Sequence, residues 1–300
     1  MVVIWYFSVK NTEELIYEDW LGVKPQLLWA LERRMDATSA LMMNTSVRTY
    51  DHTAWYIIEG RAVVKNELGE VSAGAGEWLF PAQGERRQAF DGPLKFYSLN
   101  FTAKWRDFKP LYPLDESLVL SGEALPSLRE KAKSICDELY TRLGRESWYL
   151  GVHACKLDDW LAIQRMKAEW LEDYAAAMKI LGVEHYSPSK MDPRYQQAQQ
   201  TMENHDWSQR LTMEELAQKV GVSRRQLERI YQDQLGRSPM SVFEDFKLER
   251  AKTLLLTPGV LMKEVAYEMG FNDISNFNRW FYRLTKVKAS AFRESYQIGF

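Results

Sequence analysis

The last hundred residues of this 300-residue chain carry one pattern twice, namely a short helix, a tight turn and a second helix. In the first copy, Thr212 and Glu215 have the spacing of a capping box, which satisfies two backbone donors at the start of a helix. Gly221 suits the left-handed conformation that ends helices, and Ser223 can cap the next helix with Gln226 three residues on. That helix has an apolar stripe at i, i+3 and i+4, which must be buried and leaves another face free for a partner: Leu227, Ile230 and Tyr231.

The second copy lies further along the chain. Ala266 and Gly270 follow Ala217 and Gly221 by 49 residues, and the apolar stripe recurs as Phe277, Trp280 and Phe281. The second turn is one residue longer than the first. Two helix-turn-helix units in tandem, each with a small residue where helices cross and a glycine in the turn, suit the insertion of a helix into a major groove of DNA.

Residues 195–296 resemble the DNA-binding half of the AraC/XylS family of bacterial transcription regulators. Five segments with fixed spacing carry the resemblance: Leu211 to Gly221, Gly236-Arg237-Ser238-Pro239, Lys247 to Ala251, Glu264 to Phe271, and Phe277 to Phe281. The resemblance implies a double helix-turn-helix domain that binds two adjacent major grooves of double-stranded DNA. The chain departs from the family where Lys247 replaces the usual arginine, and where Lys286-Val287-Lys288-Ala289 replaces a Gly-x-Thr-Pro turn. We expect this last turn to be built differently.

Charged and amide side chains in the two recognition helices are the candidates for DNA contact. Arginine can bind guanine through two hydrogen bonds, and Glu228 can accept one from a cytosine amino group. The resemblance matches six of these positions to base-contacting ones: Arg225, Glu228, Arg229, Ser275, Asn276 and Arg279. The full candidate set is Ser223, Arg224, Arg225, Glu228, Arg229, Asn272, Asp273, Ser275, Asn276, Arg279 and Arg283. The alternative is that these groups are solvated, with Arg229 and Arg279 paired to nearby acids.

A long helix is predicted between the two units. Ser238 can cap it, and Pro239 suits its first position because the N–H that proline lacks would be unpaired there. The helix is predicted to run to about Leu256, and some seventeen residues make a rod of roughly 25 Å. Such a rod can hold two recognition helices about one DNA turn apart, ~34 Å.

The composition is that of a folded protein. Apolar residues make up 46% and aromatic residues 13% of the chain, which excludes a disordered protein. The two cysteines, Cys136 and Cys155, fit a reducing cytosol better than a disulfide framework. No apolar run is long enough to span a bilayer, and the start lacks the basic flank of a signal peptide. We therefore expect a soluble cytoplasmic protein that does not bind a membrane.

The net charge of −2 does not by itself indicate a nucleic-acid partner. Residues 195–300 hold 15 basic and 13 acidic side chains, whereas the remainder holds 24 and 28. This contrast agrees with DNA binding by the C-terminal part but is too small to establish it.

Residues 1–120 are predicted to be β structure. Apolar and aromatic runs at 53–58, 61–64 and 96–101 are separated by glycine, asparagine and proline turns, which favours a barrel or jelly roll. Trp55 to Gly60 followed by Gly76 to Pro81 resembles the small-molecule-sensing cupin barrel. The segment from Glu13 to Arg34 fits either a helix or strands.

A metal-binding cupin needs two histidines one residue apart, a carboxylate and a third histidine. The predicted strands offer His52 alone, after Asp51. We therefore expect no metal, no cofactor and no enzymatic activity. A cupin enzyme with an accessory helical domain is a remote alternative.

A sensor barrel needs a few hydrogen-bonding groups among aromatic walls. Arginine beside aromatic faces suits a sugar or an organic acid, and six residues are candidates for binding such an effector: Arg48, Tyr50, Trp55, Trp78, Arg86 and Tyr97. The alternative is that the aromatic rings form the barrel core and the arginines lie in solvent.

Residues 121–181 change to a helical period, with two apolar stripes that begin at Leu128 and Trp160. In the family such helices commonly supply a dimer seam, which predicts a homodimer; the alternative is that both helices cover the barrel. Residues 182–194 have the composition of a linker, which leaves 195–300 as the DNA-binding domain.

These features predict an α+β multidomain chain, with an N-terminal cupin-like β-barrel, an α-helical segment and a C-terminal all-α double helix-turn-helix domain. The predicted function is a sequence-specific DNA-binding transcription regulator controlled by a small effector, with RNA polymerase as a further candidate partner. The main alternative is an effector-independent or protein-interaction regulator of the same fold.

Overall fold

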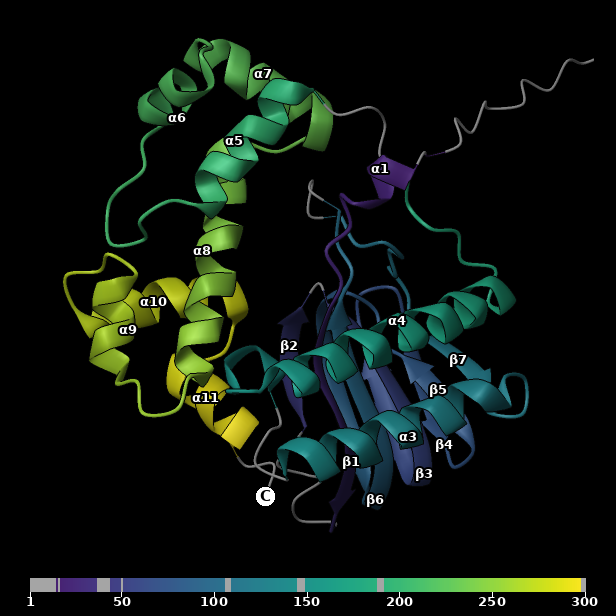
Figure 1. Cartoon of the computed structure of the whole chain (residues 1–300). Helices are drawn as coiled ribbons and strands as arrows, with labels where there is room; N and C mark the ends of the chain where they lie inside the picture. Colours follow the sequence, from purple (N-terminus) through teal and green to yellow (C-terminus); the bar gives the residue numbers. More distant parts are fainter. Residues whose placement is uncertain are drawn as a thin grey trace, which may run out of the picture.

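The computed structural model has a β-rich N-terminal half and an all-helical C-terminal half, which confirms the predicted α+β architecture (Figure 1). It describes residues 15, 17–36, 44–49, 51–105, 109–144, 149–187 and 192–297. The segment whose character the sequence left open contains a short helix, α1 (Tyr17–Trp20), and then the first strand.

The described strands of the N-terminal half form one antiparallel sheet. Its path runs β1-β6-β3-β5-β7, and β2 pairs with β6 while β4 pairs with β3. The strands are β1 (Gln26–Met35), β2 (Thr45–Thr49), β3 (His52–Lys65), β4 (Glu70–Gly74), β5 (Glu77–Phe80), β6 (Gly84–Thr102) and β7 (Leu118–Ser121).

The long antiparallel pair of β3 and β6 curls the sheet over itself. Trp55 pairs with Ser98, whereas Phe90 pairs with Ala62, seven residues further along β3 and about 23 Å away in a straight strand. The Trp55 and Phe90 ring centroids are nevertheless 5.2 Å apart. The bend falls at two register shifts around Gly60, whose φ of +87° belongs to the left-handed region. The curled sheet therefore has an interior, and closure into a cupin-type barrel stays a prediction.

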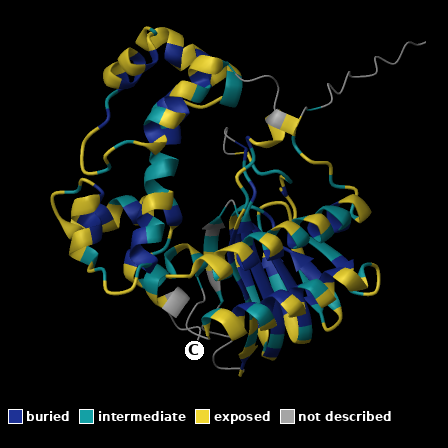
Figure 2. Cartoon of the chain, in the orientation of Figure 1, coloured by how far each residue is buried: buried dark blue, intermediate teal, exposed yellow. Residues whose placement is uncertain are grey.

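Two long helices cover the outer face of the sheet. These are α3 (Pro126–Leu143) and α4 (Leu157–Ile180), joined through a short 3-10 helix, η1 (Leu150–Val152). The stripe that begins at Leu128 is buried in one cluster with Trp170 and Tyr174 of α4 and with residues of the sheet. Figure 2 shows this buried layer between sheet and helices. The buried stripes of these helices thus cover the sheet. Of the two roles that the sequence allowed, a dimer seam or a cover, the described residues fit the cover.

The C-terminal half is a pair of helical lobes that share one long helix, α8 (Pro239–Leu256). Its beginning, with Val242 and Phe243, packs in the first lobe, and its end, with Leu254 and Leu255, packs in the second. The first lobe holds α5 (Pro193–Glu203), α6 (Met213–Val220) and α7 (Arg224–Leu235), and the second holds α9 (Met262–Glu268), α10 (Ile274–Thr285) and α11 (Ala289–Gln297).

The helix ends of the first lobe confirm the sequence prediction in detail. Thr212 with Glu215 and Ser223 with Gln226 both form reciprocal capping boxes. Gly221 ends α6 at φ 73°, in the left-handed region. Local sequence therefore fixes where α6 ends and α7 begins, and the shared core of the first lobe holds α7 with one face free.

Candidate nucleic-acid interface and effector cavity

The first recognition helix, α7, buries one face and exposes the other. Leu227, Ile230 and Tyr231 lie in the core of the first lobe, whereas Arg225 and Arg229 are exposed. Neither arginine makes a hydrogen bond or an ion pair with another residue that the structure describes. Both guanidinium groups are therefore available to an external anion or base edge.

Two other candidates on α7 are already paired. The Arg224 guanidinium donates from Nη1 to Glu214 Oε1 at 2.9 Å and from Nε to Glu228 Oε1 at 3.0 Å. Such exposed pairs are worth only about 0–1 kcal/mol, so DNA can displace them. Ser223 is occupied as the cap of α7, since its hydroxyl accepts the Gln226 N–H at 3.2 Å.

The second recognition helix, α10, carries a chain of polar contacts at its start. Asp273 caps the helix by accepting the Asn276 N–H at 2.7 Å, and the Arg279 Nη2 donates to Asn276 Oδ1 at 2.5 Å. Asn272 and Ser275 are exposed beside them. The contact with Asn276 holds the Arg279 guanidinium near the N-terminal end of α10.

Arg283 differs from the other candidates because it contacts a neighbouring helix, α8. It forms an ion pair with Glu244 of α8, and the same carboxylate accepts the Trp280 Nε1–H at 3.1 Å. Lys247 of α8 lies over the ring of Phe271, with its Nζ 4.5 Å from the centroid. These contacts fix α10 against α8. Glu244 was not among the residues predicted from the sequence to matter for the interface. Its place one turn before Lys247 on α8 is the sequence feature that could have indicated it.

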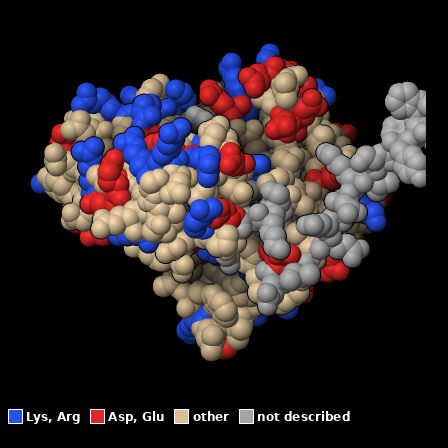
Figure 3. All heavy atoms as spheres, turned by 90° about the horizontal axis from the view of Figure 1, so that it is seen from above, with Lys and Arg blue, Asp and Glu red and all other residues tan. Residues whose placement is uncertain are grey.

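The candidate DNA-contacting residues share one property, which is that all eleven are exposed. Seen from the end that carries α6 and α7, Lys and Arg side chains gather over the side of the molecule formed by the C-terminal helices, with Asp and Glu among them (Figure 3). The surface therefore suits a polyanion through selected arginines, and not through a large excess of positive charge.

The six effector candidates do not converge on one site. Trp55 and Arg86 are buried on the inner side of the curled sheet, where Trp55 contacts Phe90 and the Arg86 Nη2 donates to Thr53 Oγ1 at 3.4 Å. Trp78 and Tyr97 lie on the outer side, in the cluster under α3 and α4. Tyr50 lies outside the described residues, and of Arg48 only the backbone is described, paired with Glu85 in the sheet.

Trp78 is core. Its side chain is completely buried, and its ring centroid lies 5.9 Å from that of Trp170 in α4. This is the alternative that the sequence analysis allowed for the aromatic candidates. Tyr97 is also largely buried, but it borders a surface pocket between the sheet and α3.

The interior of the curled sheet combines aromatic walls with a few polar groups. Thr53 Oγ1 accepts from Asn100 Nδ2 at 2.9 Å, and Arg86 Nη1 donates to the Ala82 carbonyl at 2.6 Å. Asn100 Oδ1 is buried without a hydrogen-bond partner among the described residues. A hydrogen-bond donor on a ligand or a water molecule would satisfy this oxygen.

Known proteins resemble the C-terminal half of the chain. A family model described as a helix-turn-helix domain matches residues 216–295. The arabinose operon regulatory protein of Escherichia coli is 33% identical over 103 residues, which make up 34% of this chain and 35% of that protein. Residues 216–295 therefore form an AraC-type helix-turn-helix domain.

One relative and one solved structure extend the likeness beyond the DNA-binding half of this AraC-type chain. An uncharacterized HTH-type transcriptional regulator of Bacillus subtilis, YobQ, is 24% identical over 206 residues, which cover 62% of this chain and 85% of that protein. The structure of an apo single-residue variant of ToxT from Vibrio cholerae is 12% identical and covers 90% of this chain and 96% of that one, with a TM-score of 0.51. That structural likeness shows the fold alone. The helix-turn-helix match and these relatives make the chain an AraC-type DNA-binding transcription regulator.

Nothing in the described part of this AraC-type chain gathers metal ligands. No group of three or more His, Cys, Asp or Glu side chains lies close enough there to hold a metal ion. His52 is buried and stacks on Phe101 with ring centroids 4.9 Å apart, and burial lowers its pKa to about 4. In the same described ranges, no helix is both long and apolar enough to cross a bilayer.

A cluster of charges lies where the two halves of this AraC-type chain meet. Asp51, just before β3, accepts from Lys104 Nζ at 2.8 Å, and Lys252 of α8 pairs with Glu249 at 2.8 Å. Only 13–17% of the Asp51, Lys104 and Lys252 side chains is exposed. Burial acts to raise the pKa of Asp51, but Lys104 and Lys252 outweigh it and hold that pKa below its usual value. The cluster therefore joins the start of β3 to the helix that links the two DNA-reading units.

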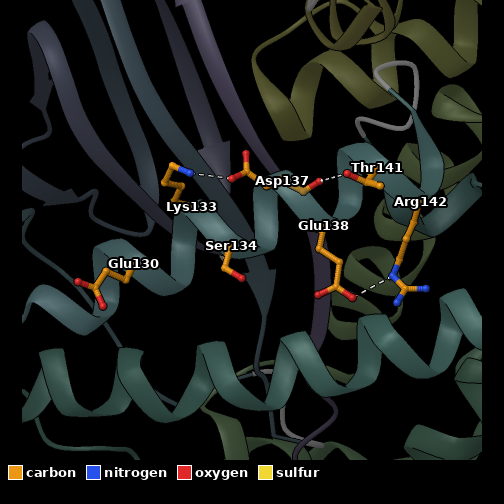
Figure 4. A pocket seen from close by; sticks show the side chains of 7 residues that line it. All are labelled: Glu130, Lys133, Ser134, Asp137, Glu138, Thr141 and Arg142. Carbon is orange, nitrogen blue, oxygen red and sulfur yellow. Dashed lines mark hydrogen bonds and ion pairs between the residues drawn. The ribbon is translucent and has the colours of Figure 1, made fainter.

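A large depression on the outside of the N-terminal half is lined by residues of α3 alone. Its volume is about 750 Å3, and Figure 4 shows its lining residues on successive turns of the helix. The charged groups balance in pairs, with Lys133 Nζ 2.9 Å from Asp137 Oδ2 and Arg142 Nε 2.9 Å from Glu138 Oε1. This surface has no groups that converge from several elements, and we assign it no ligand.

Proposed function

We propose that this chain is a sequence-specific DNA-binding transcription regulator that inserts α7 and α10 into two adjacent major grooves. The observation that carries the proposal is the pair of recognition helices on one shared rod, α8, whose 18 residues span about 27 Å. Two helices held in this way fit successive turns of duplex DNA, ~34 Å apart.

Three arginines would supply the principal contacts. Arg225 and Arg229 are exposed and have no partner among the described residues, and Arg279 is oriented by Asn276. Ser223 and Asp273 would act mainly as helix caps that present their N–H groups to phosphates, since helix N-termini favour anions. Glu228 would accept a hydrogen bond from a cytosine once Arg224 turns to a phosphate.

The N-terminal half would sense a small effector. The interior of the curled sheet, with Trp55, Arg86, Thr53 and Asn100, supports a sugar or an organic acid as its ligand because polar groups stand there among aromatic walls. In this account residues 1–120 form the sensor, 121–181 its helical cover, 182–194 the linker and 195–300 the DNA-binding domain. The chain would have no enzymatic activity.

The proposed regulator acts as a homodimer, with RNA polymerase as a further partner. The buried apolar residues of α3 and α4 pack against the sheet. The dimer interface would therefore use the exposed apolar residues at the start of α4, which are Leu157, Trp160 and Leu161. Light scattering of the full chain at micromolar concentration would give the dimer mass, and a monomer would remove this part of the proposal.

A binding-site selection with the full chain tests the proposed function. We expect a pool of random duplexes, incubated at moderate ionic strength, to yield an enriched site with two conserved segments. A chain with Arg225→Ala and Arg279→Ala together should enrich nothing, whereas Lys263→Ala, an exposed lysine outside both recognition helices, should enrich the same site. If the unaltered chain enriches no sequence, the regulator is of the protein-interaction kind and the proposal is wrong.

A further inference from the structure

A second pocket lies between the sheet and the beginning of α3, on the side of the sheet away from its interior. Its volume is about 340 Å3, at the small end of the range for ligand pockets. Unlike the depression on α3, it is lined from three elements, β3, β6 and α3. The polar lining residues are Tyr56, Lys95, Tyr97, Arg129, Glu130 and Lys133.

Two tyrosines form its floor. Tyr56 and Tyr97 are directly opposite each other on neighbouring strands, and their rings stack at 18° with centroids 6.3 Å apart. Arg129 of α3 is exposed and lines the pocket close to the Tyr56 side chain, so its guanidinium can be reached from solvent. The Tyr97 hydroxyl is protonated at neutral pH and can donate a hydrogen bond, and burial raises its pKa further.

The walls carry more positive than negative charge. Lys95, Arg129 and Lys133 face one lining acid, Glu130. Lys95 pairs with Glu32 at 3.0 Å and Lys133 with Asp137 at 2.9 Å, but both pairs are partly exposed to solvent. Because such pairs contribute about 0–1 kcal/mol, an anion entering the pocket can replace either carboxylate at little cost.

The rim beside Tyr56 is fixed by the backbone. Gly122 N–H donates to the Gly76 carbonyl at 2.8 Å, and Gly76 N–H donates to the Ile57 carbonyl at 2.8 Å. A Cβ on Gly122 would lie 2.8 Å from the Tyr56 ring, so only glycine allows this close approach. The floor and rim are thus preformed, which lowers the ordering cost of binding.

We propose that this pocket binds a small organic anion, a ring compound that carries a carboxylate or a phosphate. Arg129 can hold the oxyanion through two parallel hydrogen bonds, and Lys95 and Lys133 add charge from either side. The Tyr56 and Tyr97 hydroxyls would bond the polar groups of the ring. The site is separate from the interior of the curled sheet, and the inference does not depend on DNA binding.

Isothermal titration calorimetry on the full chain tests this site with three probes of one scaffold: glucuronate, glucose 6-phosphate and neutral glucose. We expect saturable binding of at least one of the two anions and none of glucose, and the better anion identifies the head group. Arg129→Gln should weaken that binding roughly tenfold or more. Lys95→Gln should also weaken it, and a thermal melt verifies that each variant is folded.

Lys65→Gln is the matched control, because Lys65 and Lys133 are both 62% exposed and both paired with a surface acid. We expect Lys133→Gln to weaken anion binding and Lys65→Gln to leave it unchanged. Equal losses in both would show a non-specific charge effect and overturn the proposal. A loss of anion binding in Thr53→Val with no loss in Arg129→Gln would also overturn it, because the anion would then bind inside the curled sheet. The absence of saturable binding of both anions at millimolar concentration would overturn it as well.

Discussion

At the scale of single residues, the arginines of α7 differ in the ion pairs that they must break before they bind DNA. Arg224 must leave Glu214 and Glu228, whereas Arg225 and Arg229 leave no partner in the described structure. We predict that Arg225→Ala costs about 1–3 kcal/mol at the selected site and relaxes preference at one base pair. Fluorescence anisotropy on specific and random duplexes measures both effects. An equal loss on the two duplexes would make Arg225 a phosphate contact instead.

His52 gives the stability of the chain a defined pH dependence. Burial lowers its pKa to about 4 from 6.5, so between these values the unfolded chain binds a proton that the folded chain does not. Stability should therefore fall as the pH falls through this window, by up to about 3 kcal/mol from this side chain. Urea unfolding across the window should show a shallower fall for His52→Gln. His185→Gln, at an exposed position, should keep the slope of the unaltered chain.

At the scale of elements, the end of α10 carries a conformational cost that the end of α7 avoids. Lys286 has φ 60°, where the equivalent end of α7 has Gly236 at φ 64°. A side chain in this left-handed region costs about 1 kcal/mol. We predict that Lys286→Gly stabilises the chain by about 0.5–1 kcal/mol and that Gly236→Lys destabilises it by a similar amount, both measured by thermal unfolding. Nothing lies within 4 Å of a Cβ at Gly236, so the comparison isolates the backbone. A stabilising Gly236→Lys would contradict it.

The helical elements could be predicted from the sequence because their signals are local. Capping boxes at Thr212 and Ser223, Pro239 at a first position and Gly221 at a helix end depend only on neighbouring residues. The turn after α10 was predicted to be built differently because it lacks a glycine, but Lys286 takes the same left-handed conformation as Gly236. The direction of the two recognition helices follows from these positions, so the exposure of their arginines followed as well.

The sequence could not show which effector candidates face the interior of the sheet and which face its outer side. In β3 the residues from His52 to Ile57 are all buried, so the strand lacks the alternation that tells an inner from an outer face. Trp55 and Tyr56 are adjacent yet lie on opposite sides of the sheet. The contact of Arg86 with Thr53 joins strand positions far apart in register and depends on the curl of the sheet, which no local pattern encodes.

At the scale of the whole molecule, the charge cluster around Asp51 connects the sensor half to α8. Asp51 lies two residues before Thr53, which faces the interior of the curled sheet, so a ligand there has a short route to the junction. We predict that Asp51→Asn, which removes the ion-pair partner of Lys104 and leaves Lys252 with Glu249 alone, loosens the contact between the halves. Limited trypsin digestion should then cut within residues 182–194 several-fold faster.

Asp245→Asn is the control for this prediction. Asp245 pairs with Arg237 at 2.7 Å within the C-terminal half, so its loss removes an ion pair without touching the junction. Its digestion rate should match that of the unaltered chain. Unchanged cleavage in Asp51→Asn would show that other contacts, such as the 3.1 Å pair of Lys24 with Glu203, hold the halves together.

The proposed function requires two helices that read neighbouring turns of one duplex. A hydroxyl-radical footprint of the full chain on its selected site measures this most directly. We predict two protected patches on one face of the DNA, with centres about 10 base pairs apart. A single patch, or the same uniform protection on every DNA sequence, would contradict it.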